Sequence, residues 1–171
     1  SAAGLQYARN DKGQMLSLPW SVDYFILYYN KEMFQKKGVA VPKTFDEMVA
    51  AAEKLTDAKE GTFGFVGRGL RNANMTLWTN FFLNYGGEFL DSKGGILTDG
   101  PEAIEATRLY QTLLTKVAPP GVAGFNWMES MASFTQGRSA MWIDGVGWAP
   151  PLEDPAASRI AGKVGYTVVP A

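Results

Sequence analysis

Apolar and polar positions along the chain follow two periods, one typical of strands and the other of helices. Residues 24–30, YFILYYN, form a nearly continuous apolar run, which predicts a strand covered on both faces. Residues 45–55 place apolar side chains at i, i+3, i+4, i+7 and i+10, which predicts an amphipathic helix. Further strands are predicted at 14–19, 62–66, 139–144 and 163–169, and further helices at 31–37, 75–85 (apolar almost all round, hence buried), 101–114 and 127–136. Strands that alternate with helices imply an α/β architecture.

Residues typical of helix ends support three of these helices. Asn30 is suited to cap the start of the first helix, and Gly38 to end it. Thr44 and Glu47 have the spacing of a capping box, in which each side chain bonds to the other residue's backbone amide. Pro101 suits a first helical turn.

The composition narrows the possible chemistry. The 171 residues are 46% hydrophobic and 19% charged, which is an ordinary globular balance, and one domain is expected. The net charge of −1 gives no reason to expect a nucleic acid partner. The chain has no cysteine and no histidine, so disulfides, thiolate metal sites and histidine-based catalysis are excluded within it. The sequence predicts no catalytic residue, no cofactor and no metal site, and it contains neither a membrane-spanning apolar run nor a signal peptide.

One carboxylate stands in an unusually aromatic stretch, in a chain that is 13% aromatic. Asp23 lies within PWSVDYF, next to Tyr24. It could be a strand-entry carboxylate that bonds to a nearby amide or to water. It could instead lie at the mouth of a cleft, where it accepts hydrogen bonds from ligand hydroxyls while neighbouring rings stack on the ligand.

A second group of polar residues precedes the helix at 75–85. The segment GRGLRNANMTLW contains Arg71, Asn72 and Asn74 after two glycines and Arg68. Amides at a helix start are unpaired and suit polar ligand groups, although a flexible loop with solvated arginines would read the same way. The segment matches neither a dinucleotide-binding motif nor a phosphate-binding loop.

A third group follows the strand at 139–144. Asp144 ends that strand, and Trp148 follows it after Gly145 and Gly147. Aromatic rings flanked by glycines are common beyond the strand ends of open α/β sheets, where ligands bind. Trp148 could also fill a hydrophobic gap, and Trp142 is expected in the core. Trp127 opens a helix and could face a cleft, whereas Glu129 in the same turn is explained by the helix dipole. Tryptophan and tyrosine beside aspartate, asparagine and arginine is a combination typical of carbohydrate recognition.

These motifs together resemble a known family. The stretch LPWSVDYFILYYNKEMFQKKGVAVPKTFDEMVAAAEKL resembles the entry into the C-terminal lobe of family 1 extracellular solute-binding proteins. The matching positions are Pro19, the Tyr-Asn-Lys at 29–31, Gly38 and the PKTFDE at 42–47. NYGGEFLD and AMWIDGVGWAPP are similar to later segments of the same lobe.

The resemblance implies a fold and a division of the chain. The fold would be α/β, a periplasmic binding protein-like type II lobe with three αβα layers, incomplete, and one of the two lobes of a venus-flytrap fold. Residues 1–22 would be a hinge-entry segment from the N-terminal lobe, 23–161 the C-terminal lobe without its final helices, and 162–171 the returning hinge strand.

The resemblance also implies a function. The protein would be the substrate-capturing component of an ABC importer for a sugar, oligosaccharide or polyol, with membrane permease subunits as partners. It would be periplasmic, or extracellular and lipid-anchored. Asp23 would contact ligand just past the first hinge crossing, and the loop from Arg71 to Asn74 would contact it from the C-terminal lobe. Trp148, or the backbone beside Asp144, would lie where the family often stacks an aromatic ring.

Half a cleft implies weak binding, and open sheet edges imply possible self-association. Two alternatives remain open at this point. One is a fragment of a glycoside hydrolase that uses Asp23 with Glu129 or Asp144 as its carboxylate pair. The other is a protein-interaction module with a tryptophan-rich surface.

Overall fold

The computed structural model describes residues 2–18, 20–21 and 23–171, and within them a three-stranded sheet forms the centre of the molecule. The strands are β1 (Phe25–Asn30), β2 (Met141–Gly145) and β3 (Val164–Thr167). Their order is β2-β1-β3, and both pairs are antiparallel. Phe25 lies opposite Gly145, and Leu27 lies opposite Thr167. β1 and β3 fall within the ranges that the sequence predicts, and β2 overlaps the predicted range 139–144 but ends one residue later, at Gly145.

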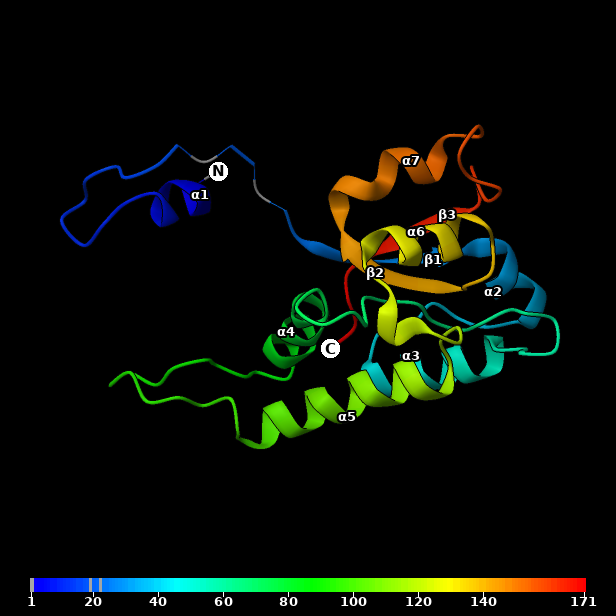
Figure 1. The fold of residues 1–171 in the computed structure, drawn as a ribbon, viewed down its shortest axis with the longest axis horizontal. Helices are drawn as coiled ribbons and strands as arrows, with labels where there is room; N and C mark the ends of the chain where they lie inside the picture. The colour runs from blue at the N-terminus through cyan, green and yellow to red at the C-terminus, as the bar shows by residue number, and fades with distance from the viewer. Residues whose placement is uncertain (1, 19, 22) are drawn as a thin grey trace.

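Helices cover both faces of this sheet, so the fold has three layers (Figure 1). α3, α4 and α5 lie on one side, and α6 and α7 lie on the other. The bounds are α1 Ala2–Tyr7, α2 Lys31–Lys37, α3 Phe45–Leu55, α4 Asn74–Asn84, α5 Pro101–Lys116, α6 Trp127–Thr135 and α7 Ala149–Glu153, with short 3-10 turns η1 at Val122–Gly124 and η2 at Val146–Trp148.

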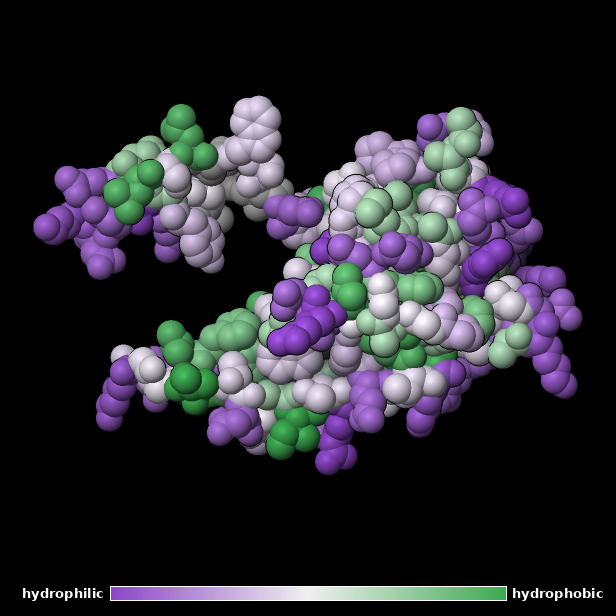
Figure 2. Space-filling view, viewed as in Figure 1, coloured by the Kyte–Doolittle hydropathy of each residue, from purple (hydrophilic) through white to green (hydrophobic). Residues whose placement is uncertain are grey.

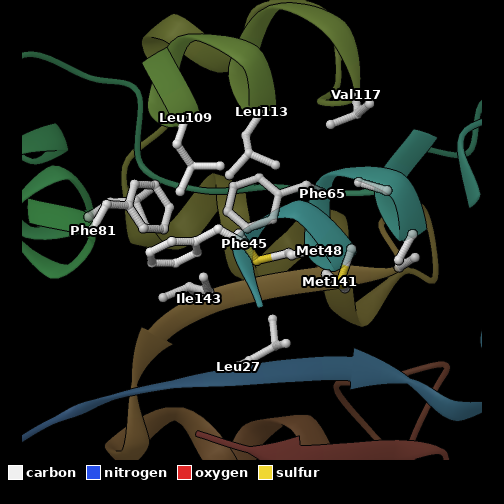
Figure 3. Packing of buried hydrophobic residues seen from close by; sticks show 14 of the residues in the cluster. Leu27, Phe45, Met48, Phe65, Phe81, Leu109, Leu113, Val117, Met141 and Ile143 are labelled. Carbon is white, nitrogen blue, oxygen red and sulfur yellow. The ribbon is translucent and has the colours of Figure 1, made fainter. Parts of the chain in front are cut away.

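Alternate side chains of the strands enter two separate cores. Leu27, Met141 and Ile143 point toward the α3–α5 side, where they pack with residues such as Met48 and Leu113 (Figure 3). Successive residues of a strand face opposite sides of a sheet, and the intervening positions therefore supply the second core.

The second core lies between the sheet and the helices α6 and α7. Tyr28 and Trp142 pack there with Phe134 and Leu152. The Tyr28 and Trp142 rings are stacked, with centroids 5.2 Å apart. Trp142 is fully buried, which confirms its predicted place in the core.

The predicted helix ends are largely confirmed. The Asn30 side chain accepts hydrogen bonds from the first amides of α2, and Gly38 ends that helix at a φ of 59°. The Thr44 hydroxyl accepts a bond from the Glu47 amide at the start of α3. The Glu47 carboxylate bonds to the Lys43 amide rather than to Thr44, so only half of the predicted capping box forms.

The expected burial of the helix at 75–85 is only partly correct. The helix forms as α4, with Leu77 and Phe81 fully buried. Met75 and Leu83 are about half exposed, however, because only one face of α4 packs against the body. Along the described part of the chain, no helix combines the length and the apolar character needed to cross a membrane.

The strand predicted at 14–19 does not form. Met15 makes a single bridge to Arg9, and Pro19 lies outside the described residues. We call residues 2–18 and 20–21 the N-terminal arm. The arm lies apart from the rest of the molecule (Figures 1 and 2), so no strand of the main body is beside it for pairing. Trp20 and Tyr7 are almost fully exposed on the arm.

The segment predicted as a buried strand at 62–66 is buried only at 64–66, and it is not a continuous strand. Phe63 and Val66 make isolated parallel bridges to Ser139 and Trp142. The pairing is interrupted between them because the Phe65 amide donates instead to the Val117 carbonyl, at 3.1 Å.

Candidate functional site

Three chain segments meet at one end of the sheet because of their pairing registers. β1 is antiparallel to β2, so β1 begins where β2 ends, and the Val146 amide extends this pairing to the Tyr24 carbonyl. The segment before the glycine-rich loop is parallel to β2, with Val66 opposite Trp142. Two residues further along, Arg68 therefore reaches Asp144. We call this region the Asp144 end of the sheet.

A buried ion pair lies at the centre of the Asp144 end. Asp144 is fully buried, and its two oxygens accept from Arg68 Nε at 2.8 Å and Nη2 at 2.5 Å. Asp144 Oδ1 also accepts from the Gly145 amide at 2.8 Å and from Trp148 Nε1 at 3.0 Å. A charge can be buried without large cost only when it is paired and hydrogen-bonded in this way. Arg68 in turn lies against the Phe25 ring, 5.9 Å from its centroid.

Two tryptophans form a stacked pair beside this ion pair. The Trp127 and Trp148 rings lie 4.3 Å apart at an angle of 12°, and both are partly exposed. Trp127 is the first residue of α6, where Asn126 and Glu129 form a complete capping box. The start of α6 is held near the glycine-rich loop because the Phe125 carbonyl accepts from the amides of residues 69 and 70. We call Trp127 and Trp148 the tryptophan pair.

Asp23 lies at the same end but is exposed to solvent. Its Oδ1 accepts from the Tyr24 amide at 3.0 Å, and its Oδ2 lies directly over the Gly145 backbone. A side-chain carbon at position 145 would come within 2.2 Å of that oxygen, so the close approach requires glycine. The Tyr24 ring is 61% exposed. An exposed carboxylate therefore lies over the residue that follows Asp144.

Asn74 is joined to the group through a tyrosine. The Tyr110 hydroxyl donates to the Arg68 carbonyl at 3.1 Å. Burial raises the pKa of Tyr110, and a hydrogen bond with the Asn74 side chain partly opposes this effect. Arg71 and Asn72 are exposed, and across the described residues neither side chain bonds to the others of the group. The structure thus places Asp23, Tyr24, Asn74, Asp144 and Trp148 at the Asp144 end and leaves Arg71 and Asn72 in solvent.

Sequence reasoning did not select Arg68, Tyr110 or Trp127 as site residues. The glycine-bearing turns before Trp127 are compatible with a position facing a cleft, but they do not single it out as a ligand contact. Arg68 was seen only as one of two arginines in a loop, and nothing local distinguishes it from Arg71. The parallel register to β2 would have done so, but a register is not visible in the sequence.

The remaining groups at this end have structural partners. The Glu129 carboxylate accepts from the Asn126 amide at 2.9 Å, in the capping box. The Tyr28 hydroxyl donates to the Gly145 carbonyl at 2.6 Å, and burial, followed by the charge of Asp144, raises the pKa of Tyr28. In the part of the chain that the structure describes, no three acidic residues converge to hold a metal ion. The arrangement offers ring faces and an exposed acceptor.

Comparison with known proteins identifies the family. A profile for bacterial extracellular solute-binding proteins matches residues 2–171, and the chain belongs to that family. The mannitol-binding protein of Pseudomonas aeruginosa is 27% identical over 163 residues, which are 93% of this chain and 37% of that protein.

Two solved structures show the same fold. A solute-binding protein of Agrobacterium radiobacter K84 in complex with ribitol has a TM-score of 0.90 and 34% identity, over 98% of this chain and 42% of that one. A maltose-bound protein of T. maritima has a TM-score of 0.87 and 28% identity, over 99% and 44%. The fold is therefore that of part of a type II periplasmic binding protein, and the chain spans about two fifths of the length of these relatives.

Proposed function

We propose that the Asp144 end of the sheet is one wall of a binding site for a sugar or polyol, in the solute-capturing component of an ABC importer. The observation that carries this proposal is that the exposed Asp23 carboxylate, which lies over Gly145, and the tryptophan pair occur at the same end of the sheet. The apolar faces of a polyhydroxylated ligand suit a ring surface, and its hydroxyls suit an ionised acceptor. The relatives bound to ribitol and maltose, and the mannitol-binding relative, support this class of ligand.

Each selected residue has a part in this proposal. Asp23 accepts hydrogen bonds from ligand hydroxyls, and Trp148 supplies a ring face. Asp144, being fully buried, contributes through its partners and through the adjacent backbone. Tyr24 and Asn74 border the wall. Arg71 and Asn72, which lie in solvent, contact ligand only from the rim.

The wider organisation is also proposed from the family. Residues 1–22 are the segment that enters from the other lobe, and 162–171 form the returning hinge strand around β3. Closure of two lobes on a ligand then signals the loaded state to membrane permease subunits. The protein acts in the periplasm, or outside the cell on a lipid anchor, and is not an enzyme.

The two alternatives lose support from the geometry. A glycosidase needs two free carboxyl groups, but Asp144 is buried in its ion pair and Glu129 belongs to a capping box. A protein-interaction surface built from Trp78, Trp142 and Trp148 would expose these rings, yet Trp142 is buried, and Trp78 and Trp148 are only partly exposed.

Calorimetric titration with ribitol, D-mannitol and maltose tests the proposal. We expect saturable binding of at least one of them, in the millimolar range. Asp23→Asn should weaken that binding about tenfold or more, because a hydrogen bond to a charged group contributes about 1.5–3 kcal/mol. Asp99→Asn removes another exposed carboxylate, in a distant turn, and should change nothing. Equal affinities for both variants and the wild type would contradict the role of Asp23.

Self-association is the last part of the proposal. The N-terminal arm exposes large apolar side chains, including Trp20 and Leu18. Exposed apolar surface of this kind favours association. Size-exclusion chromatography with light scattering should show a concentration-dependent increase in mass, whereas a monomer at all concentrations would contradict it.

A further inference from the structure

Trp148 donates a hydrogen bond to a charged group, and its ring packs against the second core. Trp148 belongs to η2, a turn of only three residues, and its Nε1 donates to Asp144 Oδ1 at 3.0 Å. We propose that the Arg68–Asp144 ion pair is a positioning device for the tryptophan pair, so that Arg68 controls ligand affinity without touching the ligand. The part concerning affinity rests on the proposed function, and the part concerning orientation does not.

The carboxylate of Asp144 cannot rotate freely. Arg68 Nη2 and Nε bind its two oxygens separately, and a planar guanidinium holding both oxygens fixes the plane of the carboxylate. Oδ1, which also accepts from the Gly145 amide, therefore receives the Trp148 indole from one fixed direction. A single-point cation could turn together with the carboxylate and would not fix this direction.

Arg68 is itself held from several sides. Its side chain is 16% exposed, it lies against the Phe25 ring, and its carbonyl accepts from the Tyr110 hydroxyl. These contacts come from β1 and α5, two elements of the main body. The ion pair thus fixes the Trp148 ring relative to β1 and α5. In this position the Trp148 ring stacks on Trp127.

The chain contains a matched aromatic pair without this device. Trp78 stacks on Phe82 at 5.0 Å and 13°, and its Nε1 donates to the neutral hydroxyl of Thr107 at 2.9 Å. Both rings lie on α4, so the helix itself places them. Thr107→Val therefore removes an indole acceptor where no positioning role is expected.

Circular dichroism reports the relative orientation of two indoles in contact, since their coupled transitions give a paired positive and negative band whose size depends on the angle between the two in-plane transition dipoles. Three variants are compared with the wild type. Arg68→Lys keeps the positive charge but cannot bond to both Asp144 oxygens in the fixed geometry of a guanidinium. Arg68→Met combined with Asp144→Leu removes both charges, which is often neutral for folding. Thr107→Val is the control. Cooperative urea unfolding verifies that each variant is folded.

We expect the paired band to fall to less than half in Arg68→Lys and in the double variant, and to persist in Thr107→Val. Ribitol affinity should fall about two- to tenfold in Arg68→Lys, because a side chain that is ordered only on binding has a cost of that size. Wild-type bands in both Arg68 variants would overturn the proposal. Loss of the paired band with unchanged ribitol affinity would confirm that Arg68 positions Trp148. It would contradict the control of affinity by Arg68 and the proposed role of the tryptophan pair as a ligand-binding surface.

Discussion

Replacing Arg68 with methionine removes the cation that neutralises a fully buried carboxylate. In the variant, Asp144 would lose both guanidinium bonds and keep the bond from the adjacent Gly145 amide. Breaking a buried pair by removing one partner costs about 3–5 kcal/mol. That is a large part of a total stability of about 5–15 kcal/mol. With a urea dependence of about 2 kcal/mol per molar, the unfolding midpoint should fall by about 2 M.

The control for this prediction is an ion pair at the surface. Arg108 lies 3.8 Å from Glu105, and both side chains are more than half exposed. Arg108→Met should therefore cost no more than about 1 kcal/mol. Urea unfolding followed by tryptophan fluorescence measures both variants. If Arg68→Met lowers the midpoint no further than Arg108→Met does, the Asp144 end is not held by a buried charge pair, and the reasoning on its geometry is refuted.

Two further predictions concern single contacts. Gly145→Ala should leave the free energy of unfolding nearly unchanged, since the φ of Gly145 is −58°, but should displace the Asp23 carboxylate and weaken ribitol binding as Asp23→Asn does. Urea unfolding and calorimetric titration measure the two effects, and wild-type affinity for ribitol would contradict the prediction. Tyr166→Phe should remove the hydroxyl that, together with the Gly162 amide, lowers the pKa of Glu153 below 4.5. A lowered carboxyl pKa stabilises the fold above the unfolded value, so the difference in stability between wild type and Tyr166→Phe should be present at pH 7 and shrink as the pH falls below 4.5. Urea unfolding at several pH values measures it, and a difference independent of pH would count against the prediction.

Local signals explain why much of the fold could be predicted. Asn30 and Thr44 cap helices through amides only a few residues away, and the apolar run of β1 is continuous in the sequence. The arm at 14–19 has strand-like residues too, but a strand also requires a neighbour. Figure 1 shows none beside it. Strand propensity alone therefore predicts a strand at 14–19 that does not form.

The site was harder to predict than the fold, because its contacts are distant in sequence. Arg68 and Asp144 are separated by 76 positions, and they meet only because 63–66 runs parallel to β2. Asp23 and Trp148 could be proposed from their aromatic and glycine-rich surroundings. The burial of Asp144 could not, since a strand-end aspartate is equally compatible with a surface position.

The most direct test of the account follows the indole N–H signals of the five tryptophans by nuclear magnetic resonance during titration with ribitol or D-mannitol. Trp127 and Trp148 should shift progressively and saturate together. Trp78, whose indole bonds to Thr107, and the buried Trp142 should stay in place. Saturating shifts confined to the tryptophan pair would agree with a ligand-binding wall at the Asp144 end. Titration of Trp78 or Trp142 alone, or no saturable shift at Trp127 and Trp148, would contradict it.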